Sequence, residues 1–242
     1  MAPPRAPIRF RLPECAPPGT EVGLPAEHAV LLQPISTIIG REAEVAAIRA
    51  QLDGGARLLT ILGPGGVGKT RLALAVAADM AASDPGGVVP VFLAGVPQAA
   101  LVLPALAVAL GVRETAGRGT RNLLISALRG RRFLVVLDNL EHVLGAAPDI
   151  AYLLAACPGL SILATSRSPL HVSGEQRFQA LPLALPPADE QLDLEALSGF
   201  PAVRLFVERA REVQSNFDLT SENAPLVAEI CRRLDGLPLA IE

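Results

Sequence analysis

One stretch of the chain, residues 58–74, constrains the fold more than any other. The apolar run 58–62 predicts a buried strand, and a helical pattern begins at Lys69. Between them, residues 63–70 read GPGGVGKT and match G-x-x-x-x-G-K-[ST] at every fixed position. Strand, glycine loop and helix in this order are the context that a phosphate-binding loop (P-loop) requires. An ordinary glycine turn is the alternative.

The chemistry of this loop depends on its backbone and on two side chains. Glycines let successive N–H groups point toward one anion, and the following helix N-terminus adds unpaired donors and partial positive charge. Lys69 is expected to reach the β- and γ-phosphates of a nucleotide, and the Thr70 hydroxyl to bind Mg²⁺. The nucleotide-binding residues predicted in this stretch are Gly63, Pro64, Gly65, Gly66, Val67, Gly68, Lys69, Thr70 and Arg71.

A second signal lies at residues 133–139, which read FLVVLDN and place Asp138 after five apolar residues. This pattern is typical of a strand buried on both faces, whose carboxyl end lies where ligands bind in open α/β sheets. Asp138 is therefore expected to hold Mg²⁺, directly or through water. The alternative is an ordinary strand that ends in an Asp-Asn turn, and the upstream P-loop favours the metal ligand.

Three further residues are predicted to lie near the γ-phosphate. Asn139 stands where many ATPases carry a second acid, and Glu141 follows two residues later. Glu141 either orients the attacking water or only supplies charge at a helix N-terminus, and the sequence favours neither role. Thr165 and Arg167 end a strand predicted from Leu160, and both are expected to meet the γ-phosphate. A surface arginine is the alternative for Arg167.

Composition narrows the functional classes. The net charge is −3 without a dense basic run, so direct nucleic-acid binding is not favoured. The three cysteines are scattered, which argues against a zinc site and indicates a reducing compartment, the cytoplasm. The most apolar window, residues 99–112, is too short to span a membrane. Half of the residues are hydrophobic but only 3% are aromatic, so the core must be aliphatic.

The pattern along the chain predicts an α/β fold, a P-loop NTPase with three α/β/α layers and a mainly parallel five-stranded sheet, followed by a small helical subdomain. We expect a flexible Pro-rich leader at 1–34, the NTPase core at 35–185, a linker at 186–200 and a partial helical subdomain at 201–242. The leader contains Arg5, Arg9 and Arg11, so a nucleic-acid-binding arm is its alternative interpretation. The predicted strands are 58–62, 88–93, 133–138, 160–167 and 177–183.

Five motifs occur in a recognisable order. They are IIGRE at 38–42, GPGGVGKT at 63–70, LDNLEH at 137–142, LATSR at 163–167 and GLPLAIE at 236–242. Together they resemble the NTPase core of the STAND class, signal-transduction ATPases related to NB-ARC domains. The variant is most similar to the modules of bacterial LuxR-type and SARP-type transcriptional regulators and of some adenylate cyclases. The resemblance covers residues 35–242.

The resemblance implies ATP or ADP with Mg²⁺ as the ligands. It implies that Gly40 and Arg41 help to hold the adenine, that Pro238 packs on the base, and that Thr165 and Arg167 occupy the sensor position. Lys69, Asp138, Glu141 and Arg167 would carry the hydrolysis. Members of this class act as switches: ADP holds a closed state, ATP opens it, oligomerisation follows, and slow hydrolysis resets the switch.

The sequence departs from this class at its C-terminal end. It ends at Glu242, inside the helical subdomain, so we expect a truncated chain or further parts on another chain. Apolar surface near residues 226–241 is expected to be exposed and to promote self-association or binding of a partner chain. A nucleotide-binding interaction module without turnover is the main alternative. A P-loop kinase would need an acceptor site, and the sequence shows no sign of one. A clamp-loader type of ATPase would differ in that Arg167 acts on the nucleotide of a neighbouring subunit.

Overall fold

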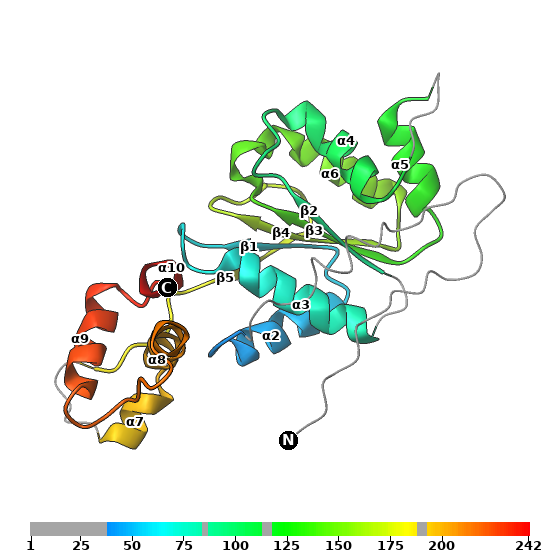
Figure 1. Cartoon of the computed structure of the whole chain (residues 1–242). Helices are drawn as coiled ribbons and strands as arrows, with labels where there is room; N and C mark the ends of the chain where they lie inside the picture. Colours follow the sequence, from blue (N-terminus) through cyan, green and yellow to red (C-terminus); the bar gives the residue numbers. More distant parts are fainter. Residues whose placement is uncertain (1–37, 84–86, 113–117, 188–192) are drawn as a thin grey trace.

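The computed structural model describes residues 38–83, 87–112, 118–187 and 193–242 (Figure 1). The predicted leader and residues 188–192 of the predicted linker lie outside them. The described sheet has five strands, all parallel, in the order β2-β3-β4-β1-β5. Their bounds are β1 Leu58–Leu62, β2 Val88–Phe92, β3 Phe133–Asp138, β4 Leu160–Ser166 and β5 Glu175–Gln179. The predicted α/β fold is confirmed, and the sheet is entirely parallel.

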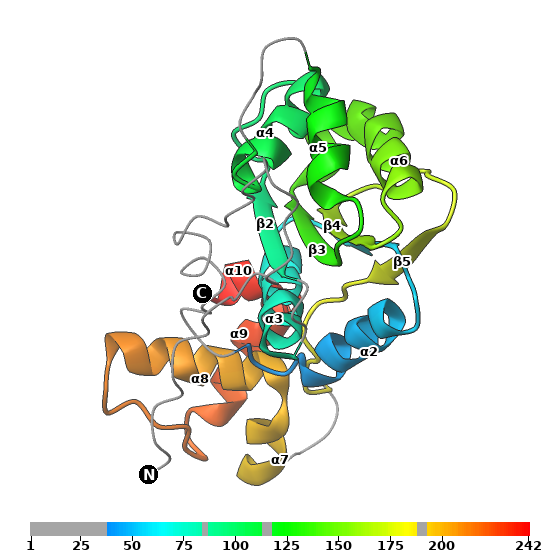
Figure 2. The ribbon, with the colours of Figure 1, turned by 90° about the vertical axis from the view of Figure 1, so that its right-hand side faces the viewer.

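Helices cover both faces of the sheet, as Figures 1 and 2 show. One face carries α2 (Glu42–Asp53) and α3 (Lys69–Ser83); the other carries α4 (Val102–Ala109), α5 (Thr120–Leu128) and α6 (Ala147–Ala156). The helical subdomain contains α7 (Leu194–Gly199), α8 (Pro201–Val213), α9 (Ala224–Arg233) and α10 (Pro238–Ile241). Short 3-10 helices are η1 (Ala99–Leu101), η2 (Leu140–His142) and η3 (Leu144–Ala146).

Strand β3 shows how the aliphatic core is divided between the two faces. Phe133, Val135 and Leu137 belong to the cluster under α4–α6, whereas Leu134 and Val136 belong to the cluster under α3. Side chains alternate between the faces of a strand, so a strand covered on both faces must be apolar at every position. This burial on both faces explains why the five residues before Asp138 are all apolar.

Strand β5 differs from its predicted bounds, and strand β2 contains a proline. The fifth strand was predicted at 177–183, but β5 covers Glu175–Gln179, so that prediction is wrong for 180–183. β5 pairs with all five residues of β1, and the chain leaves the sheet after Ala180 N donates to Leu62 O at 2.8 Å. β2 contains Pro90 and lies at the edge of the sheet, where a missing backbone donor is tolerated.

The segment predicted as a linker contains a helix, α7, so that prediction is wrong for residues 194–199. α7 begins after Asp193, whose carboxylate accepts a hydrogen bond from Ala196 N at 2.8 Å. An acid at this position satisfies one of the free N–H groups of a helix start. Acidic composition alone favours a loop here, but Asp193 and Glu195 lie at the start of a helix.

Apolar exposure at the C-terminal helices is partly as predicted. Leu226 is 63% exposed and Leu239 is 69% exposed, whereas Ile241 is buried. Among the described residues, no helix has both the length and the hydropathy that crossing a membrane requires.

The carboxylate of Glu175 joins β5 to its neighbours, and its side chain is 1% exposed. Its oxygens accept hydrogen bonds from Thr60 Oγ1 at 2.7 Å, Leu170 N at 2.9 Å, His171 N at 3.1 Å and Arg177. Burial acts to raise the pKa of Glu175, but these donors outweigh it and hold the pKa below its ordinary value. The charged form therefore stabilises the fold.

We expect Glu175→Gln to lower the free energy of unfolding by about 2 kcal/mol at pH 7, because an amide cannot accept from all of these donors. The stabilisation from a lowered pKa is present above the unfolded-state pKa, about 4.3, and is lost as the pH falls through the folded-state pKa. Urea unfolding at pH 7 and pH 3.5 should show a smaller difference at the lower pH. Exposed Glu222→Gln is the control, and an equal loss at both pH values would contradict the prediction.

Candidate functional site

The candidate site lies at the carboxyl edge of the sheet. β4 lies between β1 and β3, so the carboxyl ends of all three strands share this edge. The P-loop follows β1, Asp138 ends β3, and Thr165 is near the end of β4. The structure therefore brings together the residues that the sequence predicted for phosphate and metal binding.

The P-loop turns from β1 into α3 through left-handed backbone at Gly66, where φ is 78°. Lys69 Nζ donates to the carbonyls of Gly63 and Pro64, each at 3.0 Å. Burial lowers the pKa of Lys69, and the negative charge of Glu141 partly opposes this shift. The ammonium group of Lys69 thus lies against the loop that is predicted to bind phosphate.

The hydroxyl groups of two threonines converge on Asp138. Its Oδ1 accepts hydrogen bonds from Thr70 Oγ1 at 2.7 Å and from Thr165 Oγ1 at 2.6 Å. Thr165 Oγ1 in turn accepts a bond from Asn139 N at 2.9 Å. Carboxylate and hydroxyl oxygens are the donors that Mg²⁺ prefers, usually with phosphate and water completing the shell. The described residues contain no cluster of three or more His, Cys, Asp or Glu that would bind a metal unaided.

Glu141 and Arg167 form an ion pair beside this cluster. Arg167 Nε lies 3.2 Å from Glu141 Oε1, and the Arg167 side chain is 65% exposed. The second oxygen of Glu141 is buried without a hydrogen-bond partner among the described residues. Arg167 also lies against the P-loop, because a Cβ on Gly65 would be 3.1 Å from its NH2 group. Both side chains therefore border the P-loop, with one carboxylate oxygen still able to accept a bond.

His142 takes a structural position on η2. Its Nε2 lies 3.0 Å from Val96 O, and its Nδ1 lies 3.3 Å from Asn139 Nδ2. Asn139 adopts left-handed backbone with φ of 68°, which turns the chain sharply after Asp138. Glu141 lies on this 3-10 helix, next to the oxygen cluster.

The buried side chain of Arg41 is hydrogen-bonded to the P-loop. Its side chain is 4% exposed and donates to Val67 O and Leu181 O, each at 2.8 Å, and to Glu44 Oε1 at 2.6 Å. Gly40 has φ of 65°, and a Cβ there would lie 2.3 Å from Pro201 Cβ. The two residues predicted to hold adenine thus make close contacts within the protein, and Gly40 permits α8 to approach.

A small pocket lies beside these residues, with a volume of about 30 Å³, room for one or two waters. Pro238 lines it, as does Arg71 from α3. The remaining lining residues are Ile38, Ile39, Arg41, Gly68, Leu183 and Leu205. The sequence does not predict the apolar lining residues, because an isolated Leu or Ile carries no signal that distinguishes a pocket wall from ordinary core.

The short helix α10 closes over the P-loop. Leu239 N donates to Gly66 O at 3.2 Å, and a Cβ on Gly66 would lie 3.1 Å from Leu239 Cβ. The Glu242 carboxylate forms ion pairs with Arg71 of α3 and Arg209 of α8. The helical subdomain is thereby attached directly to the P-loop and to the start of its helix.

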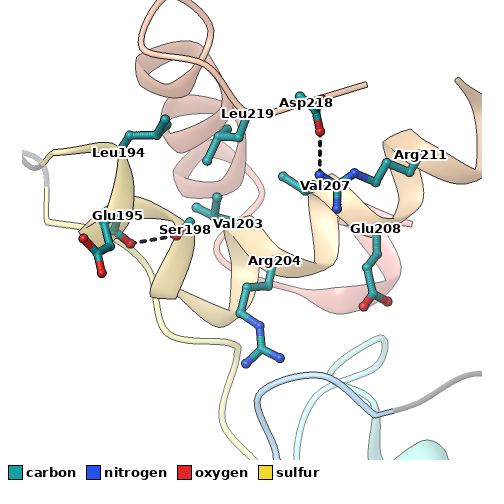
Figure 3. A pocket seen from close by; sticks show the side chains of 10 residues that line it. All are labelled: Leu194, Glu195, Ser198, Val203, Arg204, Val207, Glu208, Arg211, Asp218 and Leu219. Carbon is teal, nitrogen blue, oxygen red and sulfur yellow. Dashed lines mark hydrogen bonds and ion pairs between the residues drawn. The ribbon is translucent and has the colours of Figure 1, made fainter. Parts of the chain in front are cut away.

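A larger cavity, about 770 Å³, lies on the helical subdomain (Figure 3). Its walls include Leu194, Val203 and Leu219, and its rim carries an ion pair between Arg211 and Asp218 at 2.7 Å. Acidic and basic side chains alternate around it, so it does not favour an anion such as a nucleotide phosphate. The P-loop edge remains the candidate nucleotide site.

Comparisons with known proteins place the chain among longer proteins. It is 43% identical over 187 residues to a Mycobacterium tuberculosis protein named as a candidate HTH-type transcriptional regulator, covering 77% of this chain and 20% of the relative. It is 38% identical over 209 residues to a second M. tuberculosis protein, whose name assigns no function, covering 86% and 50%. The chain thus spans half or less of these relatives. No protein-family model matches it.

Solved structures support the fold. A chain in the structure of the Drosophila ORC bound to DNA superposes with a TM-score of 0.51 at 15% identity, covering 80% of this chain and 51% of that chain. This likeness bears on the fold alone, and with the strand order and the P-loop sequence it defines a parallel α/β fold of the P-loop NTPase type.

We expect Arg41→Lys to lower the free energy of unfolding by about 2 kcal/mol, because a lysine cannot donate to Val67 O, Leu181 O and Glu44 in one planar geometry. Thermal unfolding followed by circular dichroism would measure the change. Arg49→Lys, on the adjoining helix α2, is the matched control, since Arg49 binds exposed partners. Equal losses in the two variants would contradict a bracing role for Arg41.

Proposed function

We propose that this chain is an ATP/Mg²⁺-binding signalling NTPase module, a nucleotide-dependent switch with slow hydrolysis in a transcriptional regulator of the STAND type. The observation that carries the proposal is the convergence of Thr70 and Thr165 on Asp138, 2.7 and 2.6 Å from Oδ1, beside the P-loop. The five motifs favour the STAND subclass. The relative named as a regulator supports the transcriptional context.

In this proposal the P-loop N–H groups and Lys69 bind the nucleotide phosphates. Lys69 exchanges the carbonyls of Gly63 and Pro64 for phosphate oxygens, which carry more negative charge. Thr70 and Asp138 would hold Mg²⁺, which neutralises phosphate charge when it is bound. The hydroxyl groups of Thr70 and Thr165 both donate to Asp138 Oδ1, and this is the oxygen that would face the cation.

Glu141 is the residue proposed to orient the attacking water. Its unpaired buried oxygen can accept a hydrogen bond from water, while Arg167 occupies the other oxygen at 3.2 Å. Because Arg167 holds one oxygen of Glu141 in an ion pair, only the other oxygen is available to a water, which is consistent with slow turnover. A γ-phosphate would compete with Glu141 for Arg167, because it offers more charge in the same region.

The switch would operate through the helical subdomain. The pocket beside Pro238, about 30 Å³, is too small for an adenine ring, so binding of the base requires its walls to separate. α10 forms one wall and also bonds the P-loop at Gly66. Nucleotide binding would therefore shift the subdomain and alter the exposed surface at Leu226 and Leu239, through which we propose self-association.

The second candidate function is a nucleotide-binding module without turnover. Asn139 in place of a second acid favours it, as does the pairing of Glu141 with Arg167. The two functions share the same nucleotide site and differ only in phosphate release.

The first test is to identify any nucleotide released from the denatured purified protein and to measure Mg²⁺-dependent phosphate release. We expect bound ADP and slow release, with release lowered about tenfold or more in Lys69→Ala, because the phosphates lose their cation. Bound nucleotide without release would select the second function. A folded sample that binds no nucleotide would overturn both.

Two further variants separate the roles of Glu141 and Arg167. Glu141→Gln should slow phosphate release about tenfold or more and leave the Kd for ADP unchanged, because water activation is lost. Arg167→Gln should weaken ATP binding more than ADP binding, since only ATP presents a γ-phosphate. Exposed Glu222→Gln is the control. Unchanged release in Glu141→Gln would remove the water-orienting role.

A further inference from the structure

A cavity of about 500 Å³ lies at the amino edge of the sheet, opposite the P-loop. The end of α5 and the start of β3 form one wall, with Arg129, Gly130, Arg131 and Arg132; the end of α6 and the following turn form the other, with Ala155, Ala156, Pro158 and Gly159. β3 runs from this cavity to Asp138, a distance of about 17 Å at 3.3 Å per residue. The cavity is therefore separate from the nucleotide site.

Arginine is the sole ionisable residue type in the lining of this cavity. Within the described part of the chain, the side chains of Arg129, Arg131 and Arg132 make no hydrogen bond or ion pair. Two exposed arginines of the helical subdomain are paired, Arg211 with Asp218 and Arg233 with Glu229, whereas exposed Arg204 on α8 has no ion-pair or hydrogen-bond partner among the described residues. Three like charges gathered around one cavity repel one another, so an anion placed among them would be stabilised.

A simpler explanation is that the arginines satisfy the carbonyl groups at the end of α6, where a helix dipole favours cations. Arg57 already does this. Its NH2 group donates to Leu154 O at 2.6 Å and Cys157 O at 2.5 Å, and its Nε donates to Leu160 O at 3.1 Å. The three cavity arginines are therefore not required for capping α6.

The backbone around the cavity is closely packed. A Cβ on Gly159 would lie 2.1 Å from Arg131 O, and Phe133 N donates to Gly159 O at 3.1 Å. The turn after α6 thus contacts the chain segment that carries Arg131 and Arg132. Such packing holds the arginine backbone in place and lowers the cost of ordering it around a ligand.

We propose that this cavity binds a small polyanion, a ligand that carries two or more phosphate groups. Guanidinium groups donate paired, planar N–H groups that match phosphate oxygens, and three of them suit more than one phosphate. The volume lies within the usual range for small-ligand sites, about 300–1,000 Å³. The chain as a whole has a net charge of −3, which favours a compact anion here over a long nucleic acid. The site goes beyond the proposed nucleotide switch and uses none of its residues.

The test is calorimetric titration of tripolyphosphate into the full chain at fixed ionic strength, in a Lys69→Ala background that weakens binding at the P-loop. Binding is expected to persist in that background and to weaken about tenfold or more when Arg129→Gln, Arg131→Gln and Arg132→Gln are added. Arg211→Gln, Arg232→Gln and Arg233→Gln together are the matched control, because they remove the same number of positive charges. The control should keep the affinity.

Three results would overturn the proposal. These are equal affinity in the cavity variant, equal loss in the matched control, or binding of a single-stranded oligonucleotide that tripolyphosphate does not displace. Circular dichroism checks folding. If the glutamine variant does not fold, the same three positions changed to lysine keep the charge but lose the planar donor pairs, and several-fold weaker binding is expected. ADP binding to the cavity variant with Lys69 intact, measured in parallel, reports separately on the nucleotide site.

Discussion

The hydrogen bonds that Asp138 accepts from Thr70 and Thr165 are the interactions on which the candidate site depends. They join the start of α3 to the ends of β3 and β4, which are distant in sequence. Asp138 is only 8% exposed, and burial of a carboxylate costs less when it accepts hydrogen bonds, as its Oδ1 does from both hydroxyl groups. The same oxygens suit a hard cation, so one cluster serves both the folded core and the proposed Mg²⁺ site.

The P-loop is held from two further directions. Arg41 donates to Val67 O from the segment before α2, and Leu239 N donates to Gly66 O from α10. These contacts connect the loop to both ends of the described chain segment. A ligand that changes the loop backbone must therefore alter at least one of them, which is the physical basis of the proposed coupling to the helical subdomain.

Predictions succeeded where a motif lies next to a regular element. The mainly parallel sheet, and the position of Asp138 and Thr165 at its carboxyl edge, followed from apolar runs that end in polar residues, because parallel strands share a carboxyl edge. The contacts of Arg41 and Glu175 could not be predicted in this way. Val67 O and Leu181 O are backbone atoms present at any residue, and Glu175 collects donors from separate segments. The helix after Asp193 could not be predicted, because the acidic composition of the segment favours a loop equally.

The sequence by itself determined the α/β class, the P-loop and the edge of the sheet at which the site lies. These features depend on local spacing and on the few ways in which a parallel sheet can be covered. Only the tertiary structure decided that Arg167 pairs with Glu141, that α10 closes over Gly66, and that Arg129, Arg131 and Arg132 face one cavity. Such contacts depend on how whole layers pack, and side chains far apart in sequence carry no local signal of their partners.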